Sequence, residues 1–144
     1  MPELAVNRRA GFDYDILETF EAGIQLTGHE VKSAKLGRMN IAGCHAIVRG
    51  DELYLAGTNI QSFQPGNAPK EYDPMRTRKL LMNREEIKYL VGKLNSGLTL
   101  VPTKVYTHHG FVKLELGLGK GRKKGDKREA IKKREIERDI RRDI

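Results

Sequence analysis

The chain has 144 residues and a single cysteine, and its 27 Lys and Arg against 19 Asp and Glu give a formal net charge of +8. This length suits one domain plus an extension, and one cysteine excludes an intramolecular disulfide framework. No apolar stretch approaches the roughly 20 residues that cross a bilayer, and the N-terminus lacks an apolar run of signal-peptide length. We therefore expect a cytoplasmic protein with no membrane partner, and the basic charge favours RNA.

The first half of the sequence predicts short strands separated by glycines. Four stretches have strand composition, namely residues 14–17, 24–26, 44–49 and 52–56. Gly23, between the first two, predicts a bulge or bend, and Gly50-Asp51, between the last two, predicts a hairpin turn. A weaker helix is expected over about residues 30–36, and residues 62–77 form a long proline-containing loop.

The clearest element of the second half is a helix over residues 83–95. Asn83 can cap it, with Glu86 three residues on as in a capping box, and Gly97 ends it. Its apolar residues recur at helical spacing and form one stripe, made of Ile87, Leu90, Val91 and Leu94. Before it, residues 79–82 predict one more short strand.

A second hairpin follows this helix. Residues 98–106 and 111–116 are its strands, joined by a turn at residues 107–110. Pro102 cannot donate to a ladder and therefore marks an edge or a bulge. The glycine run at residues 117–121 is interpreted as a hinge leading into the tail.

About six short strands with glycine punctuation predict a mainly β fold, a small closed antiparallel barrel of the OB type with two or three helices. We expect the barrel over residues 1–119 and a basic C-terminal tail over residues 120–144. That tail holds 12 Lys or Arg against 6 Asp or Glu. Its apolar stripe is one residue wide, so we expect it to be disordered when free and helical when bound.

The sequence contains no set of residues that indicates an enzyme, a cofactor or a metal site. The histidines lack metal-site spacing relative to Cys44. The glycine run at residues 117–121 lacks the Gly-Lys-Ser/Thr ending of a phosphate-binding P-loop. The lysines and arginine beside it could instead hold RNA phosphates.

Several short motifs occur together in one order along the chain. They are Asn7-Arg8-Arg9-Ala10 with Asp13-Tyr14, Phe20-Glu21-Ala22-Gly23, Gly28-His29-Glu30-Val31-Lys32-Ser33, residues 73–81, and Asp126-Lys127-Arg128. In these motifs the chain resembles the SmpB family, the SsrA-binding proteins that partner transfer-messenger RNA (tmRNA) in bacterial ribosome rescue. The resemblance runs from about Asn7 into the tail.

The resemblance implies a non-catalytic adaptor whose barrel binds the tRNA-like domain of tmRNA. The adaptor brings tmRNA to stalled ribosomes for trans-translation, and its tail probes the decoding centre and the empty mRNA channel. The implied partners are tmRNA, the ribosome with its small-subunit rRNA, and elongation factor Tu acting through the tmRNA complex. The alternative is a translation protein that binds ribosomal RNA without tmRNA.

The resemblance also implies site residues. Those expected to bind RNA are Asn7, Arg8, Glu21, Glu30, Lys32, Ser33, Leu81, Lys113, Lys120, Gly121, Arg122 and Lys123. Those expected in the decoding region are Asp126, Lys127, Arg128, Lys132, Lys133 and Arg134.

The chemistry of these residues allows more than one role. Lys113 can reach a phosphate, and Glu21 can accept from base amino groups or 2′-hydroxyls or belong to a structural ion pair. Leu81 is either a core residue or a platform under a base. The Glu30, Lys32 and Ser33 side chains either contact RNA or are structural.

Overall fold

The computed structural model describes residues 3–62 and 72–121. Its elements, in chain order, are β1 (Glu3–Val6), α1 (Ala10–Asp13), β2 (Tyr14–Ile24), α2 (Gly28–Lys35), β3 (Met39–Asn40), β4 (His45–Arg49), β5 (Glu52–Ala56), β6 (Asn59–Ile60), β7 (Arg78–Leu81), α3 (Arg84–Asn95), β8 (Thr99–His108) and β9 (Phe111–Gly121). The expectations for Arg122, Lys123 and the tail residues Asp126, Lys127, Arg128, Lys132, Lys133 and Arg134 lie outside the described residues.

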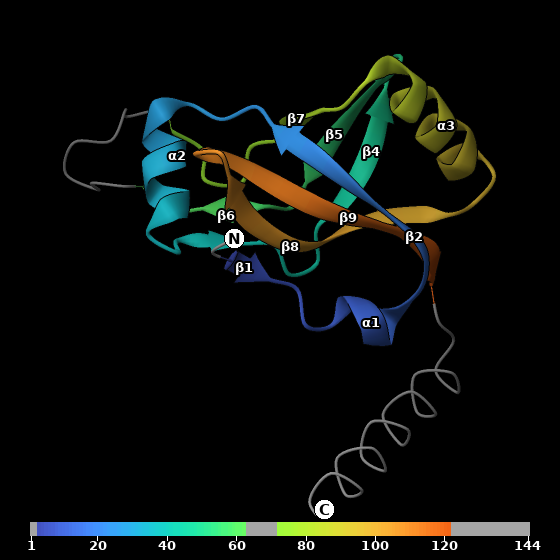
Figure 1. Ribbon diagram of the computed structural model, residues 1–144, viewed down its shortest axis with the longest axis horizontal. Helices are drawn as coiled ribbons and strands as arrows, with labels where there is room; N and C mark the ends of the chain where they lie inside the picture. The colour runs from blue at the N-terminus through green and yellow to red at the C-terminus, as the bar shows by residue number, and fades with distance from the viewer. Residues whose placement is uncertain (1–2, 63–71, 122–144) are drawn as a thin grey trace, which may run out of the picture.

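Seven of the strands form one antiparallel sheet in the order β1-β8-β9-β2-β7-β5-β4, and β3 pairs with β6. The two longest strands, β2 and β9, cross the middle of the molecule side by side (Figure 1). The prediction of a mainly β fold with helices is confirmed. The closed barrel is not confirmed, because no described ladder joins the edge strands β1 and β4.

The helices begin and end where local chemistry predicts. The Asn83 side chain accepts a hydrogen bond of 2.8 Å from the Glu86 amide, and α3 stops before Gly97, which has a φ of +101°. The helix α2 begins earlier than expected because Thr27 and Glu30 form a full capping box. Figure 1 shows α2 and α3 at opposite ends of the sheet.

The strand β2 differs from its prediction. It is one strand of 11 residues rather than two short ones, because β9 pairs with it almost throughout. The bulge lies between Ile16 and Glu18, not at Gly23. Gly23 instead lies in regular register, opposite Lys113 on one side and Leu81 on the other.

The glycine run at residues 117–121 is part of β9, so its interpretation as a hinge was wrong. Gly117 and Gly119 are buried. A Cβ atom on Gly119 would overlap the Asp15 carbonyl oxygen and lie 2.9 Å from the Asp15 carbonyl carbon. These glycines therefore permit a close approach of two backbones, and the strand continues through Lys120 to Gly121.

Both predicted hairpins are confirmed. The β4–β5 turn has Gly50 at a φ of +61°, and the β8–β9 turn has His109 and Gly110 at 52° and +81°. A register shift between Pro102 and Lys104 is the predicted bulge.

The apolar core is formed mainly by strand residues, with Ala34 of α2 and with Ile87 and Leu90 of α3. Its fully buried side chains include Leu53, Leu55, Leu80, Leu90, Leu100, Leu114, Leu116 and Leu118. No helix among residues 3–62 and 72–121 combines the length and apolarity needed to span a bilayer. Two of the residues expected to bind RNA, Glu21 and Lys113, lie on the outer face of β2 and β9.

The Gly119 contact predicts a specific loss of stability. Gly119→Ala should lower the free energy of unfolding by about 3 kcal/mol, because β2 and β9 must separate to admit the methyl group. Gly121→Ala is the matched control, since its Cβ meets nothing within 4 Å. Urea denaturation measures both; equal effects would contradict the close-approach explanation.

Candidate nucleic-acid interface

A row of directly paired residues crosses four strands on the outer face of the sheet. Tyr106 of β8 pairs with Lys113 of β9, Lys113 pairs with Gly23 of β2, and Gly23 pairs with Leu81 of β7. Residues opposite one another in a sheet point to the same face. Glu21, two residues before Gly23, also lies on this face.

Gly23 lies in the middle of this row, where there is little space for a side chain. A Cβ atom there would lie 3.2 Å from the Leu81 Cβ and 3.6 Å from the Lys113 Nζ. A side chain at this position would therefore press on Leu81 and approach the Lys113 ammonium. Leu81 is 50% exposed, so it is not a core residue.

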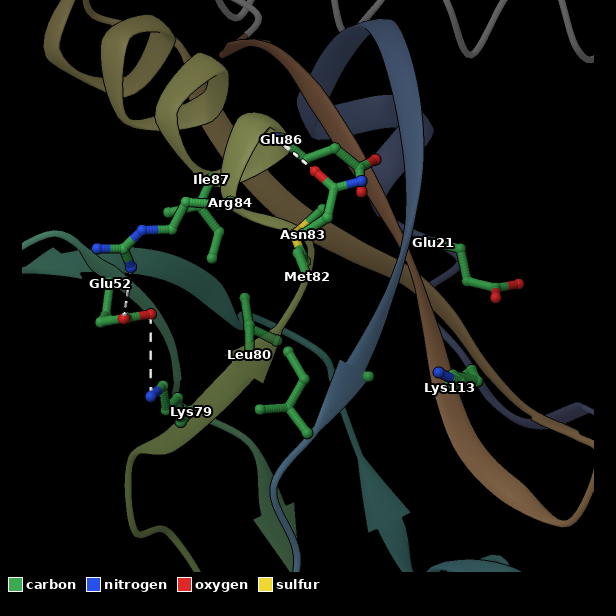
Figure 2. A pocket seen from close by; sticks show the side chains of 12 residues that line it. Glu21, Glu52, Lys79, Leu80, Met82, Asn83, Arg84, Glu86, Ile87 and Lys113 are labelled. Carbon is green, nitrogen blue, oxygen red and sulfur yellow. Dashed lines mark hydrogen bonds and ion pairs between the residues drawn. The ribbon is translucent and has the colours of Figure 1, made fainter.

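This row borders an open groove of about 490 Å³ (Figure 2). Glu21 and Lys113 lie on one side of the groove, and Glu52, Lys79 and Arg84 lie on the other. The Glu52 carboxylate lies 3.2 Å from the Arg84 guanidinium and 3.9 Å from the Lys79 ammonium. In residues 3–62 and 72–121, no carboxylate lies within 4.0 Å of the Lys113 ammonium, so this cation remains available.

Glu21 is held by two side chains of β8. The Tyr106 hydroxyl donates to Glu21 Oε2 at 2.5 Å, and His108 Nδ1 lies 3.6 Å from Oε1. The Tyr106 hydrogen bond, aided by His108 and Lys113, keeps the pKa of Glu21 below its usual value despite some desolvation. An ionised carboxylate accepts hydrogen bonds and cannot donate them. The Glu21 side chain is 45% exposed, so it can contact a bound molecule.

A second group of expected site residues lies at the α1 end of the sheet. Asn7 is half-buried, and its side-chain amide donates to the Pro102 carbonyl at 3.1 Å. Arg8 is exposed, as are Lys120 and Gly121 at the end of β9. The structure therefore places Asn7, Arg8, Lys120 and Gly121 apart from the groove that gathers Glu21, Leu81 and Lys113.

Glu30 and Ser33 are placed inside the protein. Both are completely buried, and the Ser33 hydroxyl donates to the Gln61 carbonyl. Only Lys32 of the three expected α2 residues is exposed. An RNA contact through the Glu30 or Ser33 side chain does not fit this burial.

Glu30 forms an ion pair with two arginines that sequence reasoning missed. Arg78, also completely buried, donates to Glu30 Oε2 at 2.7 Å, and the Arg76 guanidinium contacts both carboxylate oxygens. Burial opposes ionisation, but these arginines and the Thr27 amide lower the pKa of Glu30 to about 2. The spacing Thr27-x-x-Glu30 is a capping-box signal that could have indicated a structural role.

Arg78 satisfies its remaining donors on backbone carbonyls. It donates to the carbonyls of Thr58 at 2.9 Å, Pro74 at 3.0 Å and Arg76 at 3.0 Å. The Glu30–Arg78 pair therefore ties α2 to β7, the strand that carries Leu81.

Glu30→Gln should lower the free energy of unfolding by about 3 kcal/mol at neutral pH, because it leaves buried arginine charge uncompensated. The pKa of Glu30 in the folded protein lies below its unfolded value of about 4.3. The ionised carboxylate therefore stabilises the fold fully at pH values above about 4.3. This stabilisation is lost as pH falls from about 5 towards 2. Urea denaturation across this range should show the two proteins converging; a constant difference would contradict the assignment.

Comparison with known proteins shows which family this chain matches. A model of the SmpB protein family matches residues 4–144. The SsrA-binding protein of Synechococcus elongatus is 51% identical over 142 residues, 98% of this chain and 92% of its own length. That of Mesoplasma florum is 47% identical over 136 residues, 94% of this chain and 91% of its own.

A solved structure agrees with these relatives. It is described as "tmRNA-SmpB: a journey to the center of the bacterial ribosome" and superposes with a TM-score of 0.68 at 43% identity. The match covers 88% of this chain and 92% of that one. The chain therefore belongs to the SmpB protein family.

Proposed function

We propose that this chain is an RNA-binding adaptor that binds the tRNA-like domain of tmRNA and brings it to stalled ribosomes for trans-translation. Membership of the SmpB family and the likeness to the tmRNA-SmpB structure support this function. The observation that carries it is the groove beside Gly23, where Glu21, Leu81 and Lys113 converge from three strands. The proposal assigns no catalytic step to the protein.

The groove offers three kinds of contact to RNA. The Lys113 ammonium is suited to a backbone phosphate, which positions the RNA. The exposed Leu81 side chain is a platform for a base or ribose. The Glu21 carboxylate can accept from a base amino group or a 2′-hydroxyl, the groups that make RNA recognition specific.

The α1 end of the sheet supplies a second contact region in this proposal. Arg8 and Lys120 are exposed there, and the sequence continues with Arg122 and Lys123. Such a density of cations favours phosphate binding. Asn7 contributes by holding the turn that carries Arg8, since its amide and backbone are both bonded to β8.

The proposal also divides the chain into two parts. The barrel of residues 1–119 binds tmRNA together with the cations at residues 120–123. The rest of the tail acts in the decoding region, where Asp126, Lys127, Arg128, Lys132, Lys133 and Arg134 meet the small-subunit rRNA. Elongation factor Tu joins through the tmRNA complex. We further infer that the sheet is an OB barrel closed by packing, because β4 lies near β8.

Titration of the full chain with the tRNA-like domain and with an ordinary tRNA, at several salt concentrations, tests this function. We expect tight binding that keeps its preference for the tRNA-like domain as salt rises. Equal affinities that fall steeply with salt would mean generic phosphate binding. We would then favour the alternative, a translation protein that binds ribosomal RNA without tmRNA.

Two variants separate the contacts in the groove. Lys113→Met should weaken binding and reduce the slope of log affinity against log salt by about 1, because one phosphate contact is lost. Leu81→Ala should weaken binding about tenfold without changing the slope, since base stacking is not ionic. Lys88→Met, an exposed lysine of α3 that does not line the groove, is the control. Equal effects of Lys88→Met and Lys113→Met would contradict the placement of the phosphate contact at Lys113.

A further inference from the structure

We propose that Tyr106 is a positioning residue for RNA recognition. Its hydroxyl orients the Glu21 carboxylate toward an unpaired nucleotide that presents an amino or 2′-hydroxyl donor. This inference rests on the proposed function, because it specifies how the groove beside Gly23 recognises RNA.

The geometry that carries the inference spans three strands. Tyr106 lies on β8 and Glu21 on β2, with β9 between them. The Tyr106 hydroxyl nevertheless reaches Glu21 Oε2 at 2.5 Å, while the Tyr106 side chain is only 6% exposed. A buried ring has few rotamers available, so its hydroxyl is a fixed donor for an exposed and otherwise mobile carboxylate.

His108 restricts the same carboxylate from a second direction. It lies two residues along β8 from Tyr106, and its Nδ1 is 3.6 Å from Glu21 Oε1. The His108 ring is stacked on His109, with ring centroids 4.3 Å apart. Each oxygen of Glu21 therefore has one neighbour on the protein, and each keeps lone-pair capacity for a further donor.

The neighbouring acidic residue is not equivalent. Glu115 is directly opposite Glu21 in the β2–β9 ladder. Its carboxylate already accepts from the Thr103 hydroxyl at 2.9 Å and lies 3.5 Å from the Lys104 ammonium. Glu115 also does not line the groove beside Gly23. Glu21 is thus the carboxylate of this pair that faces a ligand bound in the groove.

The charge and exposure of the Glu21 carboxylate determine which chemical group of a ligand it can bind. A carboxylate kept ionised repels phosphate and requires a hydrogen-bond donor. In RNA such donors are the exocyclic amino groups and the 2′-hydroxyls, and the amino groups are free when the base is unpaired. Lys113, which pairs with Tyr106 across β8 and β9, can hold the phosphate of the same nucleotide.

A chemically similar pair elsewhere provides a matched control. The Tyr89 hydroxyl contacts both oxygens of Glu18, at 2.9 Å and 2.7 Å. Neither residue lines the groove beside Gly23. Tyr89→Phe therefore removes the same kind of hydrogen bond without altering this groove.

The experiment is a double-mutant cycle on the full chain, with affinity for the tRNA-like domain of tmRNA measured at several salt concentrations. Tyr106→Phe should weaken binding about fivefold to tenfold, because the Glu21 side chain, no longer held in place, must then be ordered when RNA binds. The salt slope should not change, since no phosphate contact is lost. Tyr89→Phe should leave the affinity unchanged.

The Glu21→Ala background separates positioning from a structural effect. If Tyr106 acts through Glu21, Tyr106→Phe should cause no further loss in that background. An equal loss in both backgrounds would overturn the inference, and so would an unchanged affinity of the single variant. Failure of the unmutated chain to prefer the tRNA-like domain over tRNA would instead refute the proposed function. Thermal unfolding of each variant confirms that the fold is retained.

Discussion

The pairing of β2 with β9 is the constraint on which the interface depends. Its register extends from Tyr14 opposite Gly121 to Gly23 opposite Lys113. Gly119 permits the close approach of the two backbones at one end, and Gly23 lies in the groove between Leu81 and Lys113 at the other. A slip of one residue would turn Lys113 from the outer face toward the core. The strand pairing thus determines both stability and the placement of the candidate RNA contacts.

Two glutamates within ten positions of each other show how burial decides the role of the same functional group. Glu30 is completely buried and neutralised by Arg78. Glu21 is exposed, and a neutral hydroxyl rather than an arginine holds it. Burying a charge requires a paired partner, whereas an exposed carboxylate stays available for a ligand. Glu30 therefore supports the candidate interface from inside, through β7, and Glu21 lies on the surface of that interface.

The sequence predicted the features whose signals are local. The Asn83 cap and the apolar spacing identified α3, and Gly50 identified a hairpin turn. Features set by distant partners were missed: the continuity of β2, the extension of β9, and the Glu30–Arg78 pair, which is 48 residues apart. Resemblance named Glu21, Leu81 and Lys113, but only the register of three strands places them around one groove.

Mapping of backbone amide chemical shifts tests the central claim most directly, using the isotope-labelled full chain with and without the tRNA-like domain of tmRNA. The largest changes should fall on residues around Glu21 and Gly23, on Leu81, on Tyr106 and on Lys113. The β4–β5 turn at Gly50 should be unaffected. Changes concentrated on that turn, with the row from Tyr106 to Leu81 unchanged, would contradict the account.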